Sequence, residues 1–163
     1  MFSSLLFVLV LSFDFEIKNT LGHNVFENVA YGKYASQSTE LVGGQFVASK
    51  AVNGVFNDFT HTDLEKNPWI RIDLGRNYTV HEVEVFGRKD CCVERLHDLD
   101  IKVGNDLHEM HLCGHFSGSC TRAGERITVF CPFNTAGRYV EIRIVEGWNN
   151  ILSVAEVLVW GHF

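Results

Sequence analysis

The sequence predicts an all-β fold, either an antiparallel sandwich or a barrel. Three observations predict it: apolar and polar residues alternate with a period of two, turn residues separate the alternating runs, and helical periodicity is weak. A strand of this kind buries one face and leaves the other in water. Several short strands with little helix are typical of sandwiches and barrels, whose end loops are free to carry function.

The expected elements follow one another along the chain. One short helix is expected at residues 45–52, with Ala48, Ala51 and Val52 toward the core. Alternating runs, expected as strands, lie at residues 69–74, 82–85, 101–103 and 139–144. Residues 154–160 are apolar almost throughout, as in a strand buried on both faces. Turn signals separate these runs at Asn67-Pro68, Gly75-Arg76-Asn77, Gly104-Asn105-Asp106 and Ala136-Gly137.

Length and charge favour one secreted domain. The chain has 163 residues and a net charge of -6, which predicts a single domain and argues against a nucleic-acid partner. The first 26 residues are expected to form a signal or leader segment ahead of the domain at residues 27–163. Residues 5–13 are apolar, too short a run to span a bilayer but suited to a secretory signal, so no membrane insertion is expected. A buried strand at residues 5–13 is the alternative.

Five cysteines also favour an oxidising, extracellular compartment, because disulfides persist there. If Cys91 and Cys92 pair with each other, three cysteines remain, which is an odd number. Cys131 follows a strand-like run and is expected to pair with a cysteine in a loop. Cys113 is the favoured partner, which leaves Cys120 free or bridged to another chain. Pairing of Cys120 with Cys131 is the alternative.

The adjacent Cys91 and Cys92 lie between Arg88 and Arg95, in the chemically most distinctive run of the chain. Consecutive Cα atoms lie ~3.8 Å apart, whereas an ordinary disulfide prefers ~4.4–6.8 Å, so bonding these two sulfurs closes a small strained ring. Strain of this kind is often found at binding sites. A sulfur surface beside two arginine forks suits a sugar, which has an apolar face and several hydroxyls. The alternative is a pair of reduced or separately bonded cysteines beside solvated arginines.

His61 lies 27 residues before Arg88, and Arg88, Asp90 and Arg95 follow the order Arg-x-Asp-x-x-x-x-Arg. With these residues the chain resembles the F-type lectins (fucolectins), whose signature is a histidine, a long gap and this Arg/Asp/Arg pattern, usually with adjacent cysteines inside it. The resemblance covers roughly residues 27–160. Further matching pieces are Asn28-Val29-Ala30, Asn67-Pro68-Trp69, Cys131-Pro132, Gly137-Arg138-Tyr139-Val140 and Ala155-Glu156-Val157.

The resemblance implies a jelly-roll β-sandwich of the discoidin-like galactose-binding architecture that binds terminal L-fucose on glycans. The sugar-binding residues that it implies are His61, Arg88, Cys91, Cys92 and Arg95. Arginine offers fixed donors to the hydroxyls and ring oxygen, and a neutral histidine accepts from or donates to the axial hydroxyl according to its tautomer. The cysteine ring is expected to pack on an apolar edge of the sugar. Asp90 is expected to hold an arginine fork in place from behind.

Family members also bind a structural calcium ion between a loop and the last strand, so the resemblance implies a Ca²⁺ site. Matched by position, its ligands are the carbonyl oxygens of Lys50, Val55 and Ala155 and the side chains of Asn53, Asp58 and Glu156. Oxygen ligands with two carboxylates suit this hard cation. Asn53 stands where the family has an aspartate, which removes a charge and lowers the expected affinity. A solvated acidic loop is the alternative.

Two further features leave alternatives open. Four side chains are candidates for contact with the methyl group of fucose, and each is an equally good candidate for the core: Leu41, Val42, Phe56 and Phe59. A histidine-rich segment, expected as an exposed loop, offers soft ligands to zinc in the rival arrangement His108, His111, Cys113, His115 and Cys120. That zinc site loses its thiolate if Cys113 is in a disulfide.

The predicted function is calcium-dependent binding of fucosylated glycans by a non-catalytic lectin, with homo-oligomers supplying avidity because a shallow pocket binds one sugar weakly. The main alternative is a discoidin-like adhesion module that binds protein or lipid through apolar loop tips. A carbohydrate module detached from a glycosidase is a second alternative. No hydrolase, zinc-protease or phosphate-loop motif occurs, and Asp98 and Asp100 on one strand face are typical of solvated carboxylates.

Overall fold

The computed structural model describes residues 25–163, which form an all-β domain as predicted. The predicted leader, residues 1–26, lies outside the described residues except for its last two positions. The strands are β1 (Glu27–Asn28), β2 (Tyr34–Gln37), β3 (Trp69–Gly87), β4 (His97–Asp106), β5 (Glu109–Ser119), β6 (Arg126–Phe130), β7 (Ala136–Ile144) and β8 (Val154–His162). Two short 3-10 helices are η1 (Ala48–Val52) and η2 (Val93–Arg95). No helix within the described range is long and apolar enough to cross a membrane.

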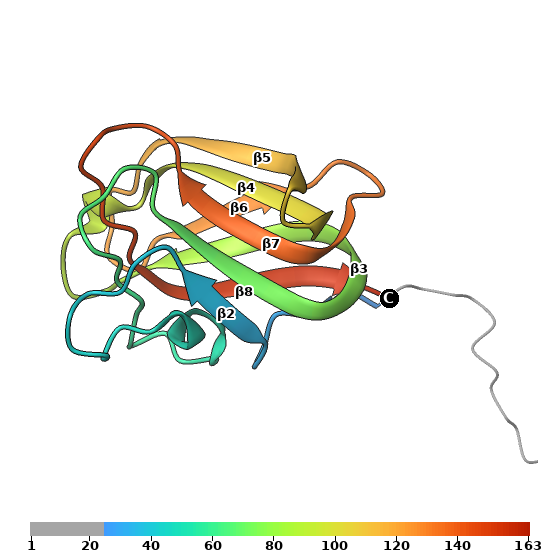
Figure 1. Ribbon diagram of the computed structural model, residues 1–163, viewed down its shortest axis with the longest axis horizontal. Coiled ribbons are helices and arrows are strands. Elements are labelled where there is room, and N and C mark those ends of the chain that lie inside the picture. Colours follow the sequence, from blue (N-terminus) through green and yellow to red (C-terminus); the bar gives the residue numbers. More distant parts are fainter. Residues whose placement is uncertain (1–24) are drawn as a thin grey trace, which may run out of the picture.

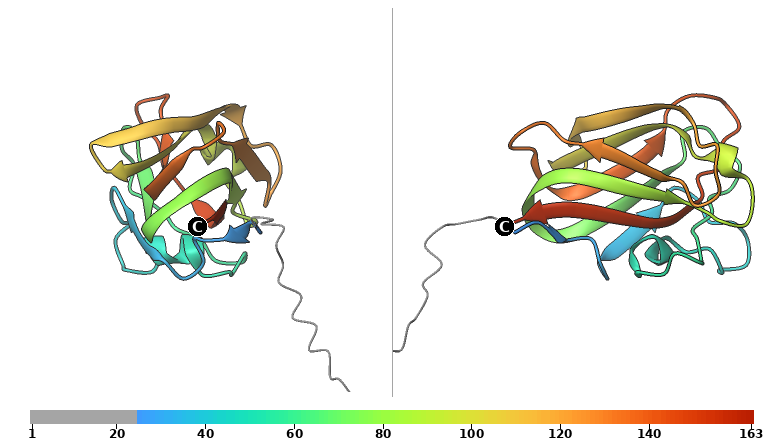
Figure 2. Two further views of the ribbon diagram at one scale, coloured as in Figure 1. Left: turned by 90° about the vertical axis from the view of Figure 1, so that its right-hand side faces the viewer. Right: turned by 180° about the vertical axis from the view of Figure 1, so that it is seen from behind.

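All strand pairs are antiparallel, and β3 belongs to both layers of the sandwich (Figure 1). Up to Asp73, β3 pairs with β2 and β7. After a register shift between Asp73 and Tyr78 it continues toward β6 and β8. One layer is therefore β2-β3-β7-β4-β5 and the other is β6-β3-β8-β1. Figure 2 shows the two layers from the side, joined by the bent strand.

The core lies between the layers and follows the predicted alternation. Ile70, Ile72 and Leu74 are fully buried, whereas the alternating residues Trp69 and Arg71 face outward. Burying one such aliphatic side chain contributes ~1.5–3 kcal/mol to the free energy of unfolding. Because side chains alternate between the two faces of a strand, the period of two specifies which face turns inward. The predicted helix is confirmed in a shorter form as η1, which buries three small side chains: Ala48, Ala51 and Val52.

Two predictions of local structure are wrong. Gly75-Arg76-Asn77 does not end a strand: it forms an exposed irregularity inside β3, with Gly75 at φ 84°, so two predicted strands become one. The histidine-rich segment is not a loop but β5. β5 lies at the edge of its layer and buries only Cys113 along its length, so its sequence lacks the apolar alternation by which inner strands are recognised.

The cysteines pair as favoured, although Cys113 lies on a strand and not in a loop. Cys113 of β5 is bonded to Cys131, directly after β6, so this disulfide joins the two layers. Cys91 is bonded to Cys92. Cys120 is free and buried, and burial raises the pKa of its thiol to about 11. With Cys113 in a disulfide, the zinc arrangement has lost its thiolate, and no cluster of three metal-binding His, Cys, Asp or Glu side chains occurs in residues 25–163.

Candidate carbohydrate-binding site

The predicted sugar-binding residues gather on loops at one end of the sandwich, opposite the C-terminus (Figure 1). Arg88, the cysteine pair and Arg95 occupy the connection from β3 to β4, where η2 forms a single turn. His61 lies in the segment before β3. Its neighbours Thr60 and Thr62 donate backbone hydrogen bonds of 2.8 and 3.1 Å to the first residue of β8 and to the segment just before it. The rigid edge of the sandwich therefore fixes the backbone of His61.

The ring of His61 has both nitrogens engaged. Its Nδ1 lies 2.7 Å from the carbonyl oxygen of Thr62 and donates to it, and Nη1 of Arg95 donates to Nε2 at 3.2 Å. This arrangement specifies the neutral tautomer with the proton on Nδ1. Burial, together with the charges of Arg95 and Arg88, lowers the pKa of His61 below the usual histidine value, although the bond to Thr62 acts in the opposite direction. The side chain therefore presents Nε2 as an acceptor.

Arg88 is held on two sides. Its Nε and Nη2 donate to the two carboxylate oxygens of Asp90 at 2.7 and 2.6 Å, and its guanidinium lies 3.7 Å from the ring centre of Phe59. The hydrogen bonds from Arg88 are the main reason why the pKa of Asp90 lies well below its usual range. The Arg88 side chain is only 9 % exposed, and Nη1 of Arg88 has no partner among residues 25–163. Asp90 thus has the geometry expected of a residue that orients an arginine.

The cysteine ring stands between the two arginines. Cys91 is exposed and Cys92 is partly buried, so the disulfide borders solvent. Cys92 adopts a left-handed backbone conformation, φ 58°, which an L-residue with a side chain rarely adopts. The carbonyl oxygen of Cys92 accepts a hydrogen bond from the backbone N–H of Arg95 at 3.2 Å. The ring therefore directs the chain into η2 and brings Arg95 back toward His61.

Two phenylalanines connect the arginine and histidine sides of the site. Phe59 stacks on Phe46 at 5.1 Å between ring centres, and the ring of Phe46 lies 5.8 Å from that of His61. Of the four candidates for the fucose methyl group, Phe59 borders Arg88. Phe56 instead packs edge-on against Phe86. Sequence reasoning missed Phe46, because no periodicity marks a single aromatic in a loop that contains Gly43 and Gly44.

The predicted calcium ligands include two carboxylates beside η1, the buried Glu156 and the half-buried Asp58. Glu156 is fully buried on β8, where its Oε2 accepts a hydrogen bond from the backbone N–H of Gly54 at 3.1 Å. Oε1 of Glu156 and Oδ1 of Asp58 are buried without a hydrogen-bond partner among the described residues. Burial first, and the neighbouring charge of Asp58 second among the raising effects, raise the pKa of Glu156 to about 7. Unpartnered oxygens on two carboxylates whose charges interact fit a hard cation.

The other predicted ligands fit a calcium site only in part. Nδ2 of Asn53 donates to Asp58 at 3.1 Å, and Oδ1 of Asn53 accepts from the backbone N–H of Val55 at 2.8 Å, so the amide must turn before its oxygen can reach a cation. Nζ of Lys50 also lies 3.9 Å from Asp58. Ala155, on β8 next to Glu156, is buried. All six predicted positions are thus on η1, the loop after it, or β8.

The chain matches a family model described as a NedA-like, galactose-binding domain over residues 50–142. It is 34% identical to a fucolectin of Anguilla anguilla over 127 residues, 70% of this chain and 79% of that protein. Among solved structures, it matches an F-lectin (fucolectin) from the serum of Morone saxatilis with a TM-score of 0.76 and 34% identity, over 83% of this chain. The match spans only 49% of that longer chain.

A second solved structure is the lectin domain of lectinolysin complexed with Lewis B antigen. It has a TM-score of 0.70 and 31% identity to this chain, and the match covers 82% of this chain and 95% of that domain. Both structural matches extend over nearly the whole sandwich described above. They therefore agree with the discoidin-like architecture as well as with the sequence similarity.

Proposed function

The chain belongs to the fucolectin (F-type lectin) family, a non-catalytic class, and from this premise we propose that it binds terminal L-fucose on glycans. The observation that carries the proposal is the convergence of His61, Arg88 and Arg95 at one end of the sandwich, with Arg95 on His61 and both arginine charges acting on that ring. Relatives named as fucolectins, and a lectin domain complexed with a Lewis antigen, support the choice of fucose.

Each side chain has a role that its hydrogen bonds allow. Nη1 of Arg88 is available as a donor, because Asp90 occupies only Nε and Nη2. Nε2 of His61 accepts from a sugar hydroxyl once Nη1 of Arg95, which donates to it in the free protein, turns to the sugar, because Nδ1 is already bound to Thr62. Arginine donors and a histidine acceptor together suit vicinal hydroxyls, each of which donates one hydrogen bond and accepts others. The exposed cysteine ring and Phe59 supply apolar surface for the methyl group and the ring edge of the sugar.

The proposal includes a calcium ion in the loop beside η1. When bound, Ca²⁺ supplies positive charge that stabilises the two carboxylates in their ionised form. Asp58 and Glu156 would hold it with their unpartnered oxygens, helped by Asn53 and by backbone carbonyl oxygens of Lys50, Val55 and Ala155. The same segment continues through Phe59 to His61, so an ordered loop keeps the phenylalanine beside Arg88. Calcium dependence of sugar binding follows from this connection.

Secretion and assembly into homo-oligomers belong to the same proposal. Two disulfides support an oxidising compartment, and a related structure comes from a fish serum protein. Because a single shallow site binds one sugar weakly, several sites in one particle are needed for useful avidity on a glycan surface.

Retention on immobilised L-fucose with elution by the free sugar tests the proposed function. We expect retention in calcium buffer, elution by L-fucose and no elution by D-glucose at the same concentration. A glycan array read with and without free fucose then gives the preferred linkage. Passage of the folded protein through the column without delay would contradict the proposal.

A second candidate function, adhesion through loop tips, is favoured by exposed apolar side chains. Val42, Leu64 and Trp148 are 92%, 62% and 75% exposed and all lie on loops. Such side chains suit a lipid or protein surface. Binding to vesicles or proteins that persists in Arg88→Ala would support adhesion, whereas fucose-dependent attachment alone would exclude it.

A further inference from the structure

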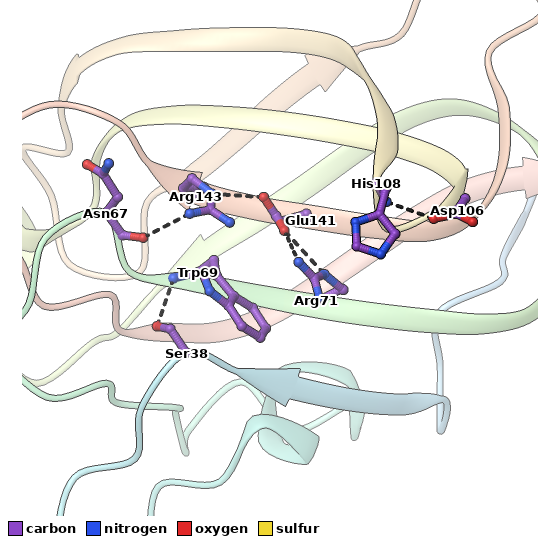
Figure 3. Close-up of polar contacts among 8 residues, drawn as sticks. All are labelled: Ser38, Asn67, Trp69, Arg71, Asp106, His108, Glu141 and Arg143. Carbon is purple, nitrogen blue, oxygen red and sulfur yellow. Dashed lines mark hydrogen bonds and ion pairs between the residues drawn. The ribbon is translucent and has the colours of Figure 1, made fainter.

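A separate hollow of about 240 Å³ lies on the outer face of the β2-β3-β7-β4-β5 layer. Four of its lining side chains rise from neighbouring strands and two come from the turn between β4 and β5: Arg71, Lys102, Glu141, Arg143, Leu107 and His108. A second hollow of about 230 Å³ adjoins it and shares Arg71 and Leu107. Figure 3 shows the polar contacts around Glu141, one of the residues that line the first hollow.

Strand register and one turn create this groove. Arg71 of β3 and Lys102 of β4 both pair with Glu141 of β7, so their side chains stand in a row on the same face. In the β4–β5 turn, Oδ1 of Asp106 accepts a hydrogen bond from the backbone N–H of His108 at 2.8 Å. The side chain of His108 then extends over the sheet beside Arg71 and Glu141 (Figure 3). The row of sheet residues forms the bottom of the groove, and the β4–β5 turn forms one of its sides.

The groove has an excess of positive charge in an otherwise acidic protein. Glu141 is 3 % exposed and accepts hydrogen bonds from Arg71 at 2.6 and 3.2 Å and from Arg143 at 2.8 Å. Burial disfavours its charged form, but the bonds from Arg143 and Arg71 hold the pKa of Glu141 below its usual value. Three cationic side chains therefore face Glu141, and Asp100 lies 3.9 Å from Lys102, so the hollow keeps an excess of one positive charge. The whole chain has a net charge of -6.

Several donors in the groove remain available. Arg71 uses Nε and Nη2 for Glu141, and Arg143 uses Nε for Glu141 and Nη1 for the carbonyl oxygen of Asn67 at 3.4 Å. Nη1 of Arg71 and Nη2 of Arg143 thus have no partner within the described range. Nζ of Lys102 lies 3.9 Å from its nearest carboxylate, Asp100, which is beyond a hydrogen bond. Glu141 holds both guanidinium groups in place, so an oxyanion meets donors that are already oriented.

Aromatic side chains continue the groove on the side of β2. Arg71 lies 4.4 Å from the ring centre of Trp69, and Tyr34 and Tyr139 line the adjoining hollow. Tyr34 is 74% exposed. Flat rings beside fixed cations suit a sugar ring that carries an anionic substituent better than they suit a free ion. We propose that this groove is a second binding site, separate from the loops at the end of the sandwich, for a sugar residue that bears a sulfate or carboxylate group.

Titration calorimetry with monosaccharides tests this proposal. The wild-type chain, kept in saturating L-fucose and calcium so that the loop site is filled, is titrated with galactose 6-sulfate, glucuronate, galactose and inorganic sulfate. We expect binding of at least one anionic sugar, no binding of galactose, and weaker binding of inorganic sulfate. The two anionic sugars distinguish a sulfate from a carboxylate ligand. Omitting fucose from a parallel titration separates this site from the loop site.

A variant pair locates the ligand. Lys102→Glu reverses the charge of a side chain that is not hydrogen-bonded to Glu141. Losing one charge-assisted hydrogen bond between Lys102 and the anionic sugar, ~1.5–3 kcal/mol, predicts at least ~10-fold weaker binding. Arg122→Glu makes the same charge change at an exposed position on the loop before β6 and should bind as wild type. Lys102→Gln, a milder change, should weaken binding in the same direction. All variants should retain fucose affinity.

Three results would overturn the proposal. The first is that neither anionic sugar binds the folded wild-type chain. The second is that Lys102→Glu and Lys102→Gln bind as tightly as Arg122→Glu. The third is that inorganic sulfate binds as tightly as the sulfated sugar, which would reduce the groove to a simple anion site. None of these results depends on whether the loop site binds fucose, because fucose affinity is measured independently.

Discussion

Nη1 of Arg95 donates a hydrogen bond to Nε2 of His61 at 3.2 Å, although the two residues lie 34 positions apart in the sequence. This contact requires a neutral imidazole, because a protonated ring has no acceptor. It connects the segment before β3 with the η2 turn after it. The protonation state of one ring thus controls both the position of Arg95 and the acceptor offered to a sugar.

Fucose binding should be insensitive to pH from 8 down through ~6.5, the ordinary histidine pKa, and should weaken only at lower pH. The reason is that burial and two arginines lower the pKa of His61 in the folded chain. The free energy of unfolding should fall in the same direction as the affinity. Below pH ~6.5 the unfolded chain takes up a proton at this histidine that the folded chain does not, so the folded state loses stability there. Calorimetric affinities at pH 8, 6.5 and 5 check the prediction. A midpoint at or above 6.5 would contradict it.

Arg88→Ala should abolish retention on fucose resin while the domain stays folded. The change removes the two N–H donors of Nη1, the group that Asp90 leaves free, and the loss of two charge-assisted bonds to the sugar predicts a loss of affinity of ~100-fold or more. Lys89→Ala, which removes the neighbouring exposed cation, is the matched control and should be retained like wild type. Unchanged retention of Arg88→Ala, with a normal melting curve, would remove Arg88 from the site.

Removing calcium should lower the melting temperature, and by more at pH 8 than at pH 6. The folded pKa of Glu156 is raised to about 7, so without a cation its stabilising protonated form is lost as pH rises through 7. Bound Ca²⁺ reverses this loss by compensating the two carboxylates. Scanning calorimetry with EDTA and with calcium at both pH values checks the difference, and Glu156→Gln should abolish it. Identical curves in all conditions would exclude the ion.

The two disulfides should have opposite effects when they are removed. Replacing Cys113 and Cys131 by serine opens a link between residues 18 apart and should lower stability by ~3 kcal/mol, while fucose affinity stays unchanged. Replacing Cys91 and Cys92 by serine opens no long loop, so stability changes little, but the sugar loses its sulfur surface and the turn before Arg95 loses the ring that constrains it. Chemical denaturation and fucose titration of both double variants provide the test. Equal affinity in all three proteins would show that the adjacent cysteines do not contact the sugar.

Thiol labelling should find Cys120 unreactive in the folded chain and reactive after denaturation without reductant. Cys120 is 3 % exposed, and burial raises the pKa of its thiol to about 11, so little thiolate is present at neutral pH. One labelled thiol per denatured chain, counted by mass spectrometry, is the expected result. Labelling of the native chain at the rate of a free peptide, or no labelling after denaturation, would contradict this arrangement.

Sequence reasoning predicted the features that depend on local periodicity or on a family signature. Alternation gave the inward faces of β3, β4 and β7, because burial selects every second residue. The signature gave His61, Arg88 and Arg95 as candidates. The stacking of Phe46 and Phe59 and the row formed by Arg71 and Glu141 depend on which loops and strands become neighbours. Register between distant strands is a tertiary property, so no local pattern reports it.

Because β3 is hydrogen-bonded in both layers, the two layers share one strand, and melting of either layer frees one end of that strand. The disulfide between Cys113 and Cys131 ties the same layers together at their edge. The sandwich should consequently open as one cooperative unit and not layer by layer. Since β3 ends at Gly87, directly before Arg88, the loop that carries Arg88 and Arg95 is attached to the strand whose backbone amides should exchange most slowly with solvent.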